Sequence, residues 1–376
     1  MMRVLQVIGA MDRAGAETMI MNLYRAIDRT RVQFDFLVHE QRECDYDEEI
    51  RELGGRLHRL PRFTGVNLPT YRAGCRRLFA EHRYPVVHGH IGSSAAVYLR
   101  EAKRAGSYAV AHSHAQNFLR GAPGFAFRIV AYPTRFVADH FMACSLEAGV
   151  DRFGRRVVEG GSFSLLNNGI DLSLYRCDQA AHEAAKRRLK VAGRPVLGHV
   201  GRLSGEKNHR FLFEVFSQVL RELPDAVLLL VGRGPLRGEL ERLAQERGLS
   251  DSVRFLGVCD DVPGVLKALD VFVFPSTKEG LAMAAVEAQA VGATCVLSTG
   301  VPEATVVSPR VFRLDLSLGA SRWARAVIEA YESSLSRDRA DCVEEVRAHG
   351  FDIADTAAWL EGFYLDAAAR ALMRRG

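Results

Sequence analysis

Short runs of apolar residues alternate with amphipathic stretches along most of this chain of 376 residues. The pattern opens with a strand-like run at Val4–Ile8, followed by Ala16–Ile27, in which apolar residues recur at helical spacing. Further strand-like runs, separated by helical stretches, lie at 34–39, 55–60, 86–89 and 108–112. Strands that alternate with helices predict βαβ units, and therefore a parallel sheet with helices on both faces.

The same alternation starts again after a turn signal at Asn167–Asp171. Strands are predicted at 195–200, 226–231, 253–256 and 271–274, and helices at 208–220, 236–247 and 281–290. We therefore predict an α/β protein of two doubly wound parallel-sheet domains, 1–178 and 179–350, with a final helix over 351–373. Ligands of open α/β sheets bind at the carboxyl ends of the strands, so we expect the site in a cleft where the two sheets face each other.

Composition excludes several classes of protein. Hydrophobic residues make up 48% and charged residues 25%, which excludes disorder for the bulk of the chain. There is no apolar run long enough to span a membrane, and the N-terminal apolar stretch is too short for a signal peptide. The seven cysteines stand singly, without a C-x-x-C pair, so neither a disulfide framework nor a zinc site is indicated. We expect a reduced, cytoplasmic protein.

Positive charge is concentrated in residues 51–135, where fourteen Arg and Lys stand against three Glu. This excess fits either an ordinary solvated face or a surface for anionic lipid or a phosphorylated acceptor. Within it, the stretch Phe118–Phe136 interleaves aromatic residues with arginines, which favours contact with an anionic membrane; alternatively, its aromatics belong to the core. Nucleic acid is not expected, because no nucleic-acid-binding motif accompanies the charge.

Two loops of the second half carry residues suited to a diphosphate and a sugar. Arg202 and Lys207 stand between a strand and a helix, where a guanidinium, an ammonium and helix N–H groups together suit a diphosphate. The second loop, which follows the strand 271–274, carries Glu279 and leads into a helix containing Glu287. Glu279 is placed to face sugar hydroxyls, and ribose hydroxyls would satisfy a buried Glu287. The alternative interpretations are that Arg202 and Lys207 stand in an ordinary polar loop, that Glu279 caps the helix, and that Glu287 forms a structural salt bridge. The free N–H groups at the start of this helix can hold an anion, and they belong to Leu281, Ala282, Met283 and Ala284.

The first half offers a glycine and a group of histidines. Gly15 opens the first helix, and its lack of a side chain lets a phosphate approach the backbone closely. The spacing Gly9-x5-Gly15 does not fit the G-x-G-x-x-G fingerprint, which argues against a dinucleotide. Histidines stand at the ends of two predicted strands, at 88, 90, 112 and 114. No ligand pattern of Asp, Glu or Cys accompanies them, so we predict hydrogen bonding or packing and no metal.

Taken together, these segments resemble the retaining GT-B glycosyltransferases of glycosyltransferase family 4, in the branch of bacterial capsular and exopolysaccharide enzymes. The matching segments occur in the family's order and lie at 15–25, 111–118, 143–154, 167–175, 201–208, 228–241 and 270–292. The resemblance implies two Rossmann-like domains facing across a cleft. It makes residues 1–178 the acceptor side, completed by 351–376, and residues 179–350 the nucleotide-sugar domain.

The resemblance also assigns roles to single residues. Arg202 and Lys207 match the diphosphate-binding pair, and Glu279 and Glu287 match the carboxylates for the donor sugar and the ribose. Gly15 matches the glycine whose amide approaches the phosphate. His114 matches the histidine near the sugar, with His112 as a weaker candidate. The implied catalytic residues are Glu279, His114, Arg202 and Lys207. Three positions depart from the family: Ala14 replaces a glycine, and Leu281 and Ala282 stand where the family often has an aromatic residue and then Pro or Gly.

The function implied is retaining transfer of a hexose from a nucleoside diphosphate sugar, UDP-sugar favoured, without metal or cofactor. The acceptor would be a glycan or a lipid-linked sugar in surface polysaccharide synthesis, with peripheral contact at the inner face of the membrane. The main alternative is a non-catalytic relative that binds nucleotide sugar and regulates or scaffolds a sugar-transferring complex. A nucleotide-sugar epimerase and a nicotinamide oxidoreductase fit less well, because paired acid/base groups and the phosphate fingerprint are missing.

Overall fold

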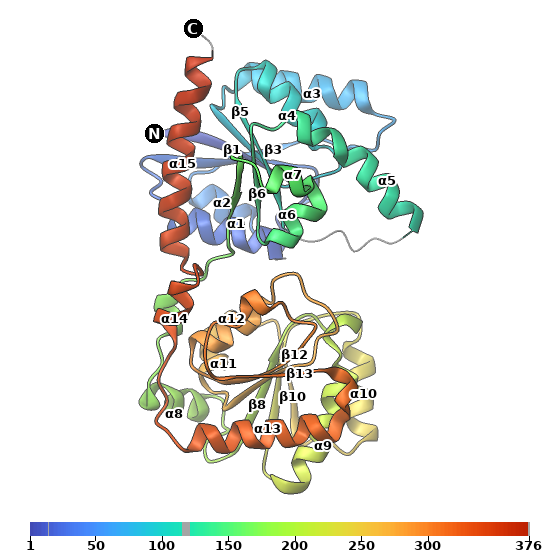
Figure 1. Cartoon of the computed structure of the whole chain (residues 1–376), viewed down its shortest axis with the longest axis vertical. Coiled ribbons are helices and arrows are strands. Elements are labelled where there is room, and N and C mark those ends of the chain that lie inside the picture. The colour runs from blue at the N-terminus through green and yellow to red at the C-terminus, as the bar shows by residue number, and fades with distance from the viewer. Residues whose placement is uncertain (14, 115–120, 375–376) are drawn as a thin grey trace. The chain divides into compact units, whose positions relative to one another are not determined.

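The computed structural model describes residues 1–13, 15–114 and 121–374, and the chain divides into two compact units. Unit 1 comprises 1–170 and 350–376, and unit 2 comprises 171–349. Each is a parallel sheet with helices around it (Figure 1). The first division falls after Ile170, not at the predicted 178, because residues 172–175 form a short helix that packs on helices of unit 2. The predicted α/β fold class is confirmed.

The sheet of unit 1 has seven strands in the described residues, in the order β3-β2-β1-β4-β5-β6-β7, and all neighbours are parallel. The strands are β1 (Met2–Ile8), β2 (Val32–Val38), β3 (Leu57–Arg59), β4 (Val86–Gly89), β5 (Tyr108–Ser113), β6 (His140–Ala143) and β7 (Phe163–Leu165). The helices are α1 (Gly15–Ala26), α2 (Asp47–Glu52), α3 (Leu68–Glu81), α4 (Ala95–Arg104), α5 (Gly121–Ala131), the 3-10 helix η1 (Tyr132–Phe136), α6 (Leu146–Phe153), α7 (Arg155–Val158) and α15 (Ile353–Met373).

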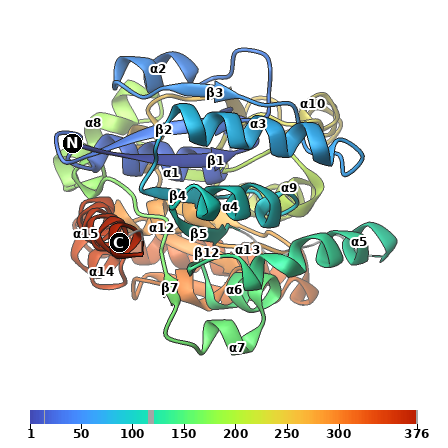
Figure 2. The same cartoon turned by 90° about the horizontal axis from the view of Figure 1, so that it is seen from above.

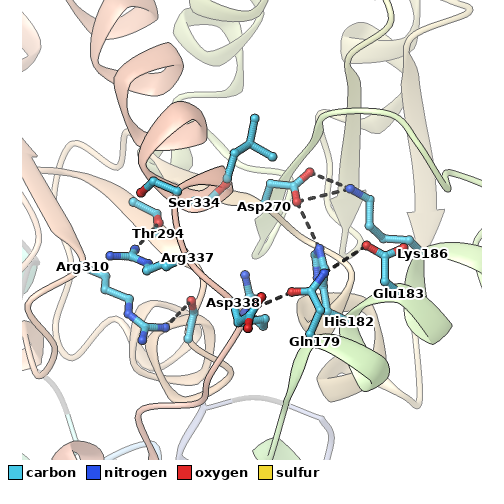
Figure 3. A pocket seen from close by; sticks show the side chains of 14 residues that line it. Gln179, His182, Glu183, Lys186, Asp270, Thr294, Arg310, Ser334, Arg337 and Asp338 are labelled. Carbon is cyan, nitrogen blue, oxygen red and sulfur yellow. Dashed lines mark hydrogen bonds and ion pairs between the residues drawn. The ribbon is translucent and has the colours of Figure 1, made fainter.

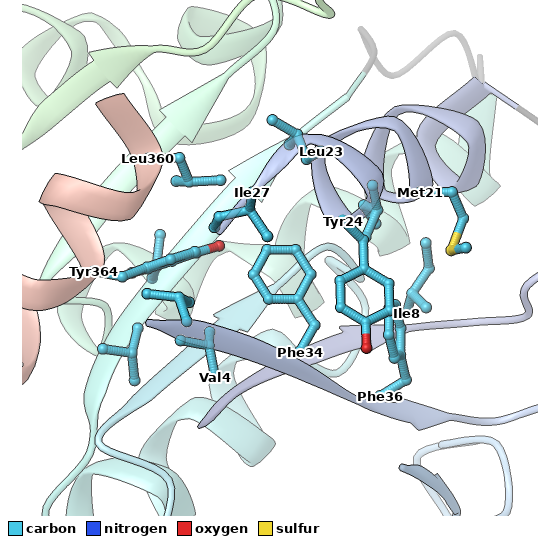
Figure 4. Packing of buried hydrophobic residues seen from close by; sticks show 14 of the residues in the cluster. Val4, Ile8, Met21, Leu23, Tyr24, Ile27, Phe34, Phe36, Leu360 and Tyr364 are labelled. Atoms are coloured by element: carbon cyan, nitrogen blue, oxygen red, sulfur yellow. The ribbon is translucent and has the colours of Figure 1, made fainter. Parts of the chain in front are cut away.

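The core of unit 1 lies on both faces of its sheet. On one face α1 and α15 cover the strands, and Tyr364 of α15 meets Phe34 of β2 edge to face, at 5.9 Å between ring centroids (Figure 4). On the other face α3 and α4 cover them with side chains such as Tyr71 and Tyr98. The last helix of the chain is therefore part of the first unit's core.

The sheet of unit 2 has six parallel strands in the described residues, in the order β10-β9-β8-β11-β12-β13. The strands are β8 (Val196–Val200), β9 (Val227–Val231), β10 (Val253–Gly257), β11 (Val271–Phe274), β12 (Thr294–Ser298) and β13 (Val311–Leu314). The α-helices are α8 (Gln179–Arg188), α9 (His209–Glu222), α10 (Arg237–Glu246), α11 (Val262–Lys267), α12 (Met283–Ala290), α13 (Gly319–Leu335) and α14 (Val343–Ala348). The 3-10 helices are η2 (Leu172–Tyr175), η3 (Gly205–Lys207), η4 (Glu303–Thr305) and η5 (Leu316–Leu318).

Helix α5 forms where the sequence had suggested only a broken pattern. Gly121, Pro123 and Gly124 all fall in its first turn, where a proline costs no hydrogen bond and helix-weakening residues disturb the fewest neighbours. Figures 1 and 2 both show α5 leading away from the sheet of unit 1. No helix among the described residues is long and apolar enough to cross a membrane.

Candidate functional site

Loops at the carboxyl edge of unit 2's sheet bring Lys207 and Glu279 together. Lys207 ends η3, after β8, and Glu279 lies in the loop after β11. The Lys207 Nζ lies 2.6 Å from Glu279 Oε1, and the two side chains are only 16% and 11% exposed. The same Nζ lies 4.8 Å from the centre of the Phe274 ring, which favours the charged ammonium. The structure therefore brings together Lys207 and Glu279, which the sequence had assigned separately to a diphosphate and to sugar hydroxyls.

Backbone contacts fix the loop that carries Lys207. The Thr277 N–H donates to Glu206 O at 2.8 Å, which ties this loop to the one after β11. Gly232 and Gly234 pack against the backbone on its other side: a Cβ on Gly234 would lie 2.3 Å from Leu203 O, and one on Gly232 would lie 2.0 Å from Gly201 O. Gly232 and Gly234, in the loop that follows β9, thus serve close backbone packing.

Arg202 lies in the same loop but is arranged differently. Its side chain is exposed, and it forms no salt bridge with any residue that the structure describes. Its charge helps to lower the pKa of Glu206, after the hydrogen bond from Ser204 and the other local contributions. Arg202 therefore remains available as a cation for a ligand, whereas Lys207 is already held by a carboxylate.

Glu287 lies on α12, the helix that follows the loop carrying Glu279. Its carboxyl hydrogen-bonds the Tyr175 side chain of η2. Burial raises the pKa of Glu287 to about 7, and the Tyr175 hydrogen bond opposes this shift. The alternative of a salt bridge is not what the structure shows. Tyr175 is a residue that the sequence analysis missed as a partner, although it ends one of the matching segments.

The start of α12 leaves backbone donors uncapped. Ala282 is the N-cap residue and offers no side-chain hydrogen bond, and the first helical bond runs from Ala285 N–H to Ala282 O at 2.8 Å. The N–H groups of Met283 and Ala284 therefore have no intrahelical acceptor. The capping alternative for Glu279 is not found: its carboxylate holds Lys207, and its N–H donates to Gly300 O at 3.1 Å. Leu281 is partly exposed beside these donors.

In unit 1, Gly15 is the first residue of α1, and outside its chain neighbours and its own helix no atom of the described residues lies within 4 Å of where a Cβ would stand. The backbone at the start of α1 is therefore open to approach. Ala14 lies outside the described residues, as does the end of the matching segment 111–118 beyond His114.

The four histidines predicted at the strand ends form one stacked group in unit 1. His88 and His90 follow one another at the end of β4, and His112 and His114 do so at the end of β5. The His112 and His114 ring centroids are 4.1 Å apart, and those of His88 and His90 are 4.4 Å apart. Burial lowers the pKa of His88 to about 3 and that of His114 to about 4, so all these rings are neutral at pH 7.

A chain of hydrogen bonds ties His114 to the last helix. The Gln6 Nε2 donates to the Tyr364 hydroxyl at 3.1 Å, and the Gln6 Oε1 lies 2.8 Å from His90 Nε2. The His90 Nδ1 lies 2.7 Å from His114 Nε2, and the Tyr364 hydroxyl lies 2.6 Å from His88 Nδ1. The sequence analysis predicted neither Gln6 nor Tyr364 as part of this group.

This chain determines which ring nitrogen of His114 carries the proton. Because the Gln6 Oε1 can only accept, His90 must donate from Nε2, and its Nδ1 is then an acceptor. His114 must therefore donate from Nε2, which leaves its Nδ1 with a free lone pair. That Nδ1 has no hydrogen-bond partner in the described structure. His114 is thus a neutral ring with an unpartnered acceptor at Nδ1, which is closed to solvent in the described structure.

His88, His90 and His112 are also the residues that could gather around a metal, since one ring nitrogen from each lies within 4.8 Å of the others. However, both nitrogens of His90 and one of His88 already have hydrogen-bond partners. The absence of a bound metal remains a prediction.

Both units match models of glycosyltransferase domains. The family model "Glycosyl transferases group 1" matches residues 181–349, and the "Glycosyl transferase 4-like domain" matches 14–160. EpsF of Bacillus subtilis (strain 168), named as a glycosyltransferase, is 35% identical over 96% of each chain. A GDP-mannose-dependent phosphatidylinositol monomannoside mannosyltransferase of Mycobacterium tuberculosis is 28% identical over 78% of each chain. Among solved structures, HepE of Anabaena in complex with UDP has a TM-score of 0.79, with 18% identity and 97% and 100% of the two chains covered.

Proposed function

Because the chain belongs to the GT-B glycosyltransferases of group 1 with a family-4-like first domain, we propose that it is a retaining hexosyltransferase that uses a nucleoside diphosphate sugar. The donor proposed is a UDP-sugar, supported by the UDP bound in the structure of HepE. The acceptor proposed is a glycan or a lipid-linked sugar of a surface polysaccharide. The observation that carries the proposal is the Lys207–Glu279 pair beside the uncapped start of α12.

The diphosphate is assigned to three groups of donors in unit 2. Arg202 is an unpaired, exposed cation, Lys207 is a half-enclosed one, and the N–H groups at the start of α12 add a partial positive charge. An incoming phosphate gives the Lys207 ammonium a second anionic partner. Glu279 keeps that ammonium in place and has its other oxygen for a sugar hydroxyl.

Glu287 is assigned to the ribose. Its carboxyl hydrogen-bonds only the Tyr175 hydroxyl among the described contacts, and burial makes its charge costly. Two ribose hydroxyls would supply the donors that a buried carboxylate needs. From unit 1, Gly15 and His114 are proposed as donor contacts, the first through its amide and the second through the lone pair on Nδ1, with His112 as a weaker candidate.

The chemistry follows from where charge develops. As the bond from the anomeric carbon to the phosphate oxygen breaks, negative charge grows on the diphosphate, and Arg202, Lys207 and the helix N–H groups stabilise it. The departing phosphate oxygen takes the proton of the acceptor hydroxyl, which attacks from the same face and so retains the configuration. The proposal requires no metal and no cofactor, because protein cations meet the growing charge.

The two carboxylates provide the test. Calorimetry with UDP and with a UDP-sugar should show that Glu287→Gln weakens both ligands, whereas Glu279→Gln weakens only the sugar-bearing donor. A matched control is Glu303→Gln, since Glu303 is 90% exposed in the same unit. GDP and GDP-mannose form the parallel panel, because one relative is named as GDP-mannose-dependent. Equal losses with both ligands in both variants would contradict the assignment, and stronger binding of GDP would contradict the choice of base.

A second part of the proposal concerns a surface that we call the α5 face, made of Phe125, Ile129, Tyr132 and Phe136. Their spacing places them along one side of α5 and η1, and they are 68%, 58%, 51% and 73% exposed. The alternative that the aromatics are core residues is therefore wrong for the three aromatics of this face; Phe118 and Arg120 lie outside the described residues. Arg128 flanks this face.

We propose that the α5 face enters an anionic membrane at its inner surface, where a lipid-linked acceptor is found. Exposed aromatics beside arginines are the pattern of an interfacial helix, and each basic residue near the surface adds roughly 1 kcal/mol. Co-sedimentation should show binding to anionic vesicles that is weakened by salt and by Phe125→Ser with Phe136→Ser. The control is Leu318→Ser, which removes from unit 2 an apolar side chain that is 53% exposed. Equal binding of both variants, or none by the wild type, would refute the membrane proposal.

A further inference from the structure

Unit 2 holds a polar cavity at the edge of its sheet opposite to Lys207 and Glu279. Its volume is about 510 Å³, within the range of cavities that hold small ligands. Asp270 directly precedes β11, Thr294 begins β12 and Arg310 precedes β13, so the cavity lies at the amino ends of these strands. Lys207 and Glu279 follow the carboxyl ends of strands in the same parallel sheet. The two sites are therefore at opposite edges of one unit.

Three arginines line this cavity, and all their hydrogen-bond acceptors are neutral. The Arg310 Nη1 donates to Gly292 O at 3.1 Å and to Ala340 O at 2.5 Å. The Arg339 Nε donates to Val291 O at 2.9 Å, and the Arg337 Nη2 to Thr294 Oγ1 at 3.1 Å. In the part of the chain that the structure describes, none of the three forms a salt bridge with a carboxylate. Three positive charges are thus gathered without an anion between them.

The guanidinium of Arg339 is enclosed and incompletely bonded. Its Nη2 is closed to solvent and has no hydrogen-bond partner among the described residues. A guanidinium stays charged in proteins, and burying it without a carboxylate partner costs free energy that an anion in the adjoining cavity would offset through its charge. Burial lowers the pKa of Arg337, and the neighbouring charge of Arg310 lowers it further. The buried Arg339 guanidinium and the lowered pKa of Arg337 both indicate a region with an excess of positive charge.

The acidic residues of the cavity do not neutralise the three arginines. Asp270 already accepts from Lys186 Nζ at 3.0 Å and from the Val196 N–H at 2.7 Å, and the His182 Nε2 lies 3.2 Å from its carboxylate. Glu183 accepts from Gln179 at 3.2 Å. Figure 3 shows Arg310 and Arg337 with Thr294 on one side of the cavity, and the side chains of α8 with Asp338 facing them. The arginine side suits an anion, and the side with amide and carboxylate groups suits hydroxyls.

We propose that this cavity binds a phosphate monoester of sugar size, with its phosphate on Arg310, Arg337 and Arg339 and its hydroxyls toward Gln179 and Asp338. Guanidinium groups bind phosphate through paired N–H donors, and several of them in an enclosed place give both affinity and orientation. The ligand is distinct from the nucleotide donor, because its site is at the other edge of the sheet.

Calorimetry with glucose 6-phosphate, inorganic phosphate and glucose tests the proposal on the full chain. We expect the sugar phosphate to bind, phosphate to bind more weakly and glucose not to bind. Arg337→Gln should weaken the sugar phosphate by roughly ten- to a hundredfold, the effect of losing one hydrogen bond to a charged group. Arg337 is exposed and holds only Thr294, so this variant keeps the fold.

Two controls establish that the sugar phosphate binds in this cavity and nowhere else on the chain. Arg325→Gln removes the same charge from an exposed position on α13 and should leave binding unchanged. Lys207→Ala, or saturating UDP, should also leave it unchanged. Absence of binding by the wild type, an equal loss in Arg325→Gln, or displacement by UDP would each overturn the proposal, the last by placing the phosphate in the donor site.

Discussion

Replacing Tyr364 with phenylalanine tests whether the hydrogen-bond chain behind His114 is as tight as its distances indicate. The substitution keeps the ring that packs on Phe34 and removes one hydroxyl, which leaves His88 Nδ1 and Gln6 Nε2 without partners in a buried place. Each of these two unsatisfied groups costs about 1–3 kcal/mol, so unit 1 should lose roughly 2–6 kcal/mol of stability.

Tyr24→Phe is the matched control. Tyr24 is equally buried and stacks on the same Phe34, but its hydroxyl donates to Leu53 O at 3.1 Å, a carbonyl that also accepts from Gln33. Since no group is left unpaired, its loss should cost only about 1 kcal/mol.

The chain has one tryptophan in each unit, Trp359 in unit 1 and Trp323 in unit 2, so a Trp323→Phe background lets fluorescence report unit 1 alone during urea unfolding. Nitrogen-15 spectra of the histidine rings add a second measurement: in Tyr364→Phe, His114 should no longer hold the single Nε2–H form. Equal stability losses for the two tyrosine variants, with His114 unchanged, would refute the reasoning.

The remaining predictions concern the charged groups. Lys207→Ala and Arg202→Ala should each raise the barrier to turnover by about 2–4 kcal/mol while weakening donor binding less, and an unchanged kcat in both would contradict their role. Activity should survive a chelator; loss of activity restored by magnesium or manganese would show a metal requirement. Because its pKa is raised, Glu287 contributes fully to the free energy of unfolding below about pH 4.5, and this contribution is lost as the pH rises towards 7. Glu287→Gln should therefore flatten the dependence of Tm on pH over that range. The lowered pKa values of His88 and His114 act in the opposite sense: their contribution is full above about pH 6.5 and is lost as the pH falls towards 4, which denaturation of unit 1 at stepped pH would reveal.

Periodicity predicted the strands whose runs are uniformly apolar, such as Val4–Ile8 and Val271–Phe274. It did not predict β6, β7, β12 or β13, because each of these strands has only three to five residues and at least one of them is polar. Helix α5 was missed since Gly and Pro in a first turn look the same in sequence as Gly and Pro in a loop.

Residue types and their positions after parallel strands were enough to select Lys207 and Glu279 as candidate site residues, but not to predict the ion pair between them. Hydrogen bonds between distant segments could not be read in the same way. Gln6 and Tyr364 stand 358 positions apart, and the residues around each of them in the sequence do not indicate that the two side chains pair. The arginine cavity was missed for the same reason, since Arg310 lies far along the chain from Arg337 and Arg339 and joins them only in the folded unit.

The placement of α15 has a consequence for how the protein is made. Residues 1–170 leave the ribosome long before Leu360 and Tyr364, yet those two side chains cover Val4 and Phe34 in the finished unit. During synthesis the nascent first unit therefore carries an uncovered apolar strip until the whole second unit has been translated. A chain stopped before residue 353 would keep that strip open permanently, and would depend on chaperones to stay out of aggregates.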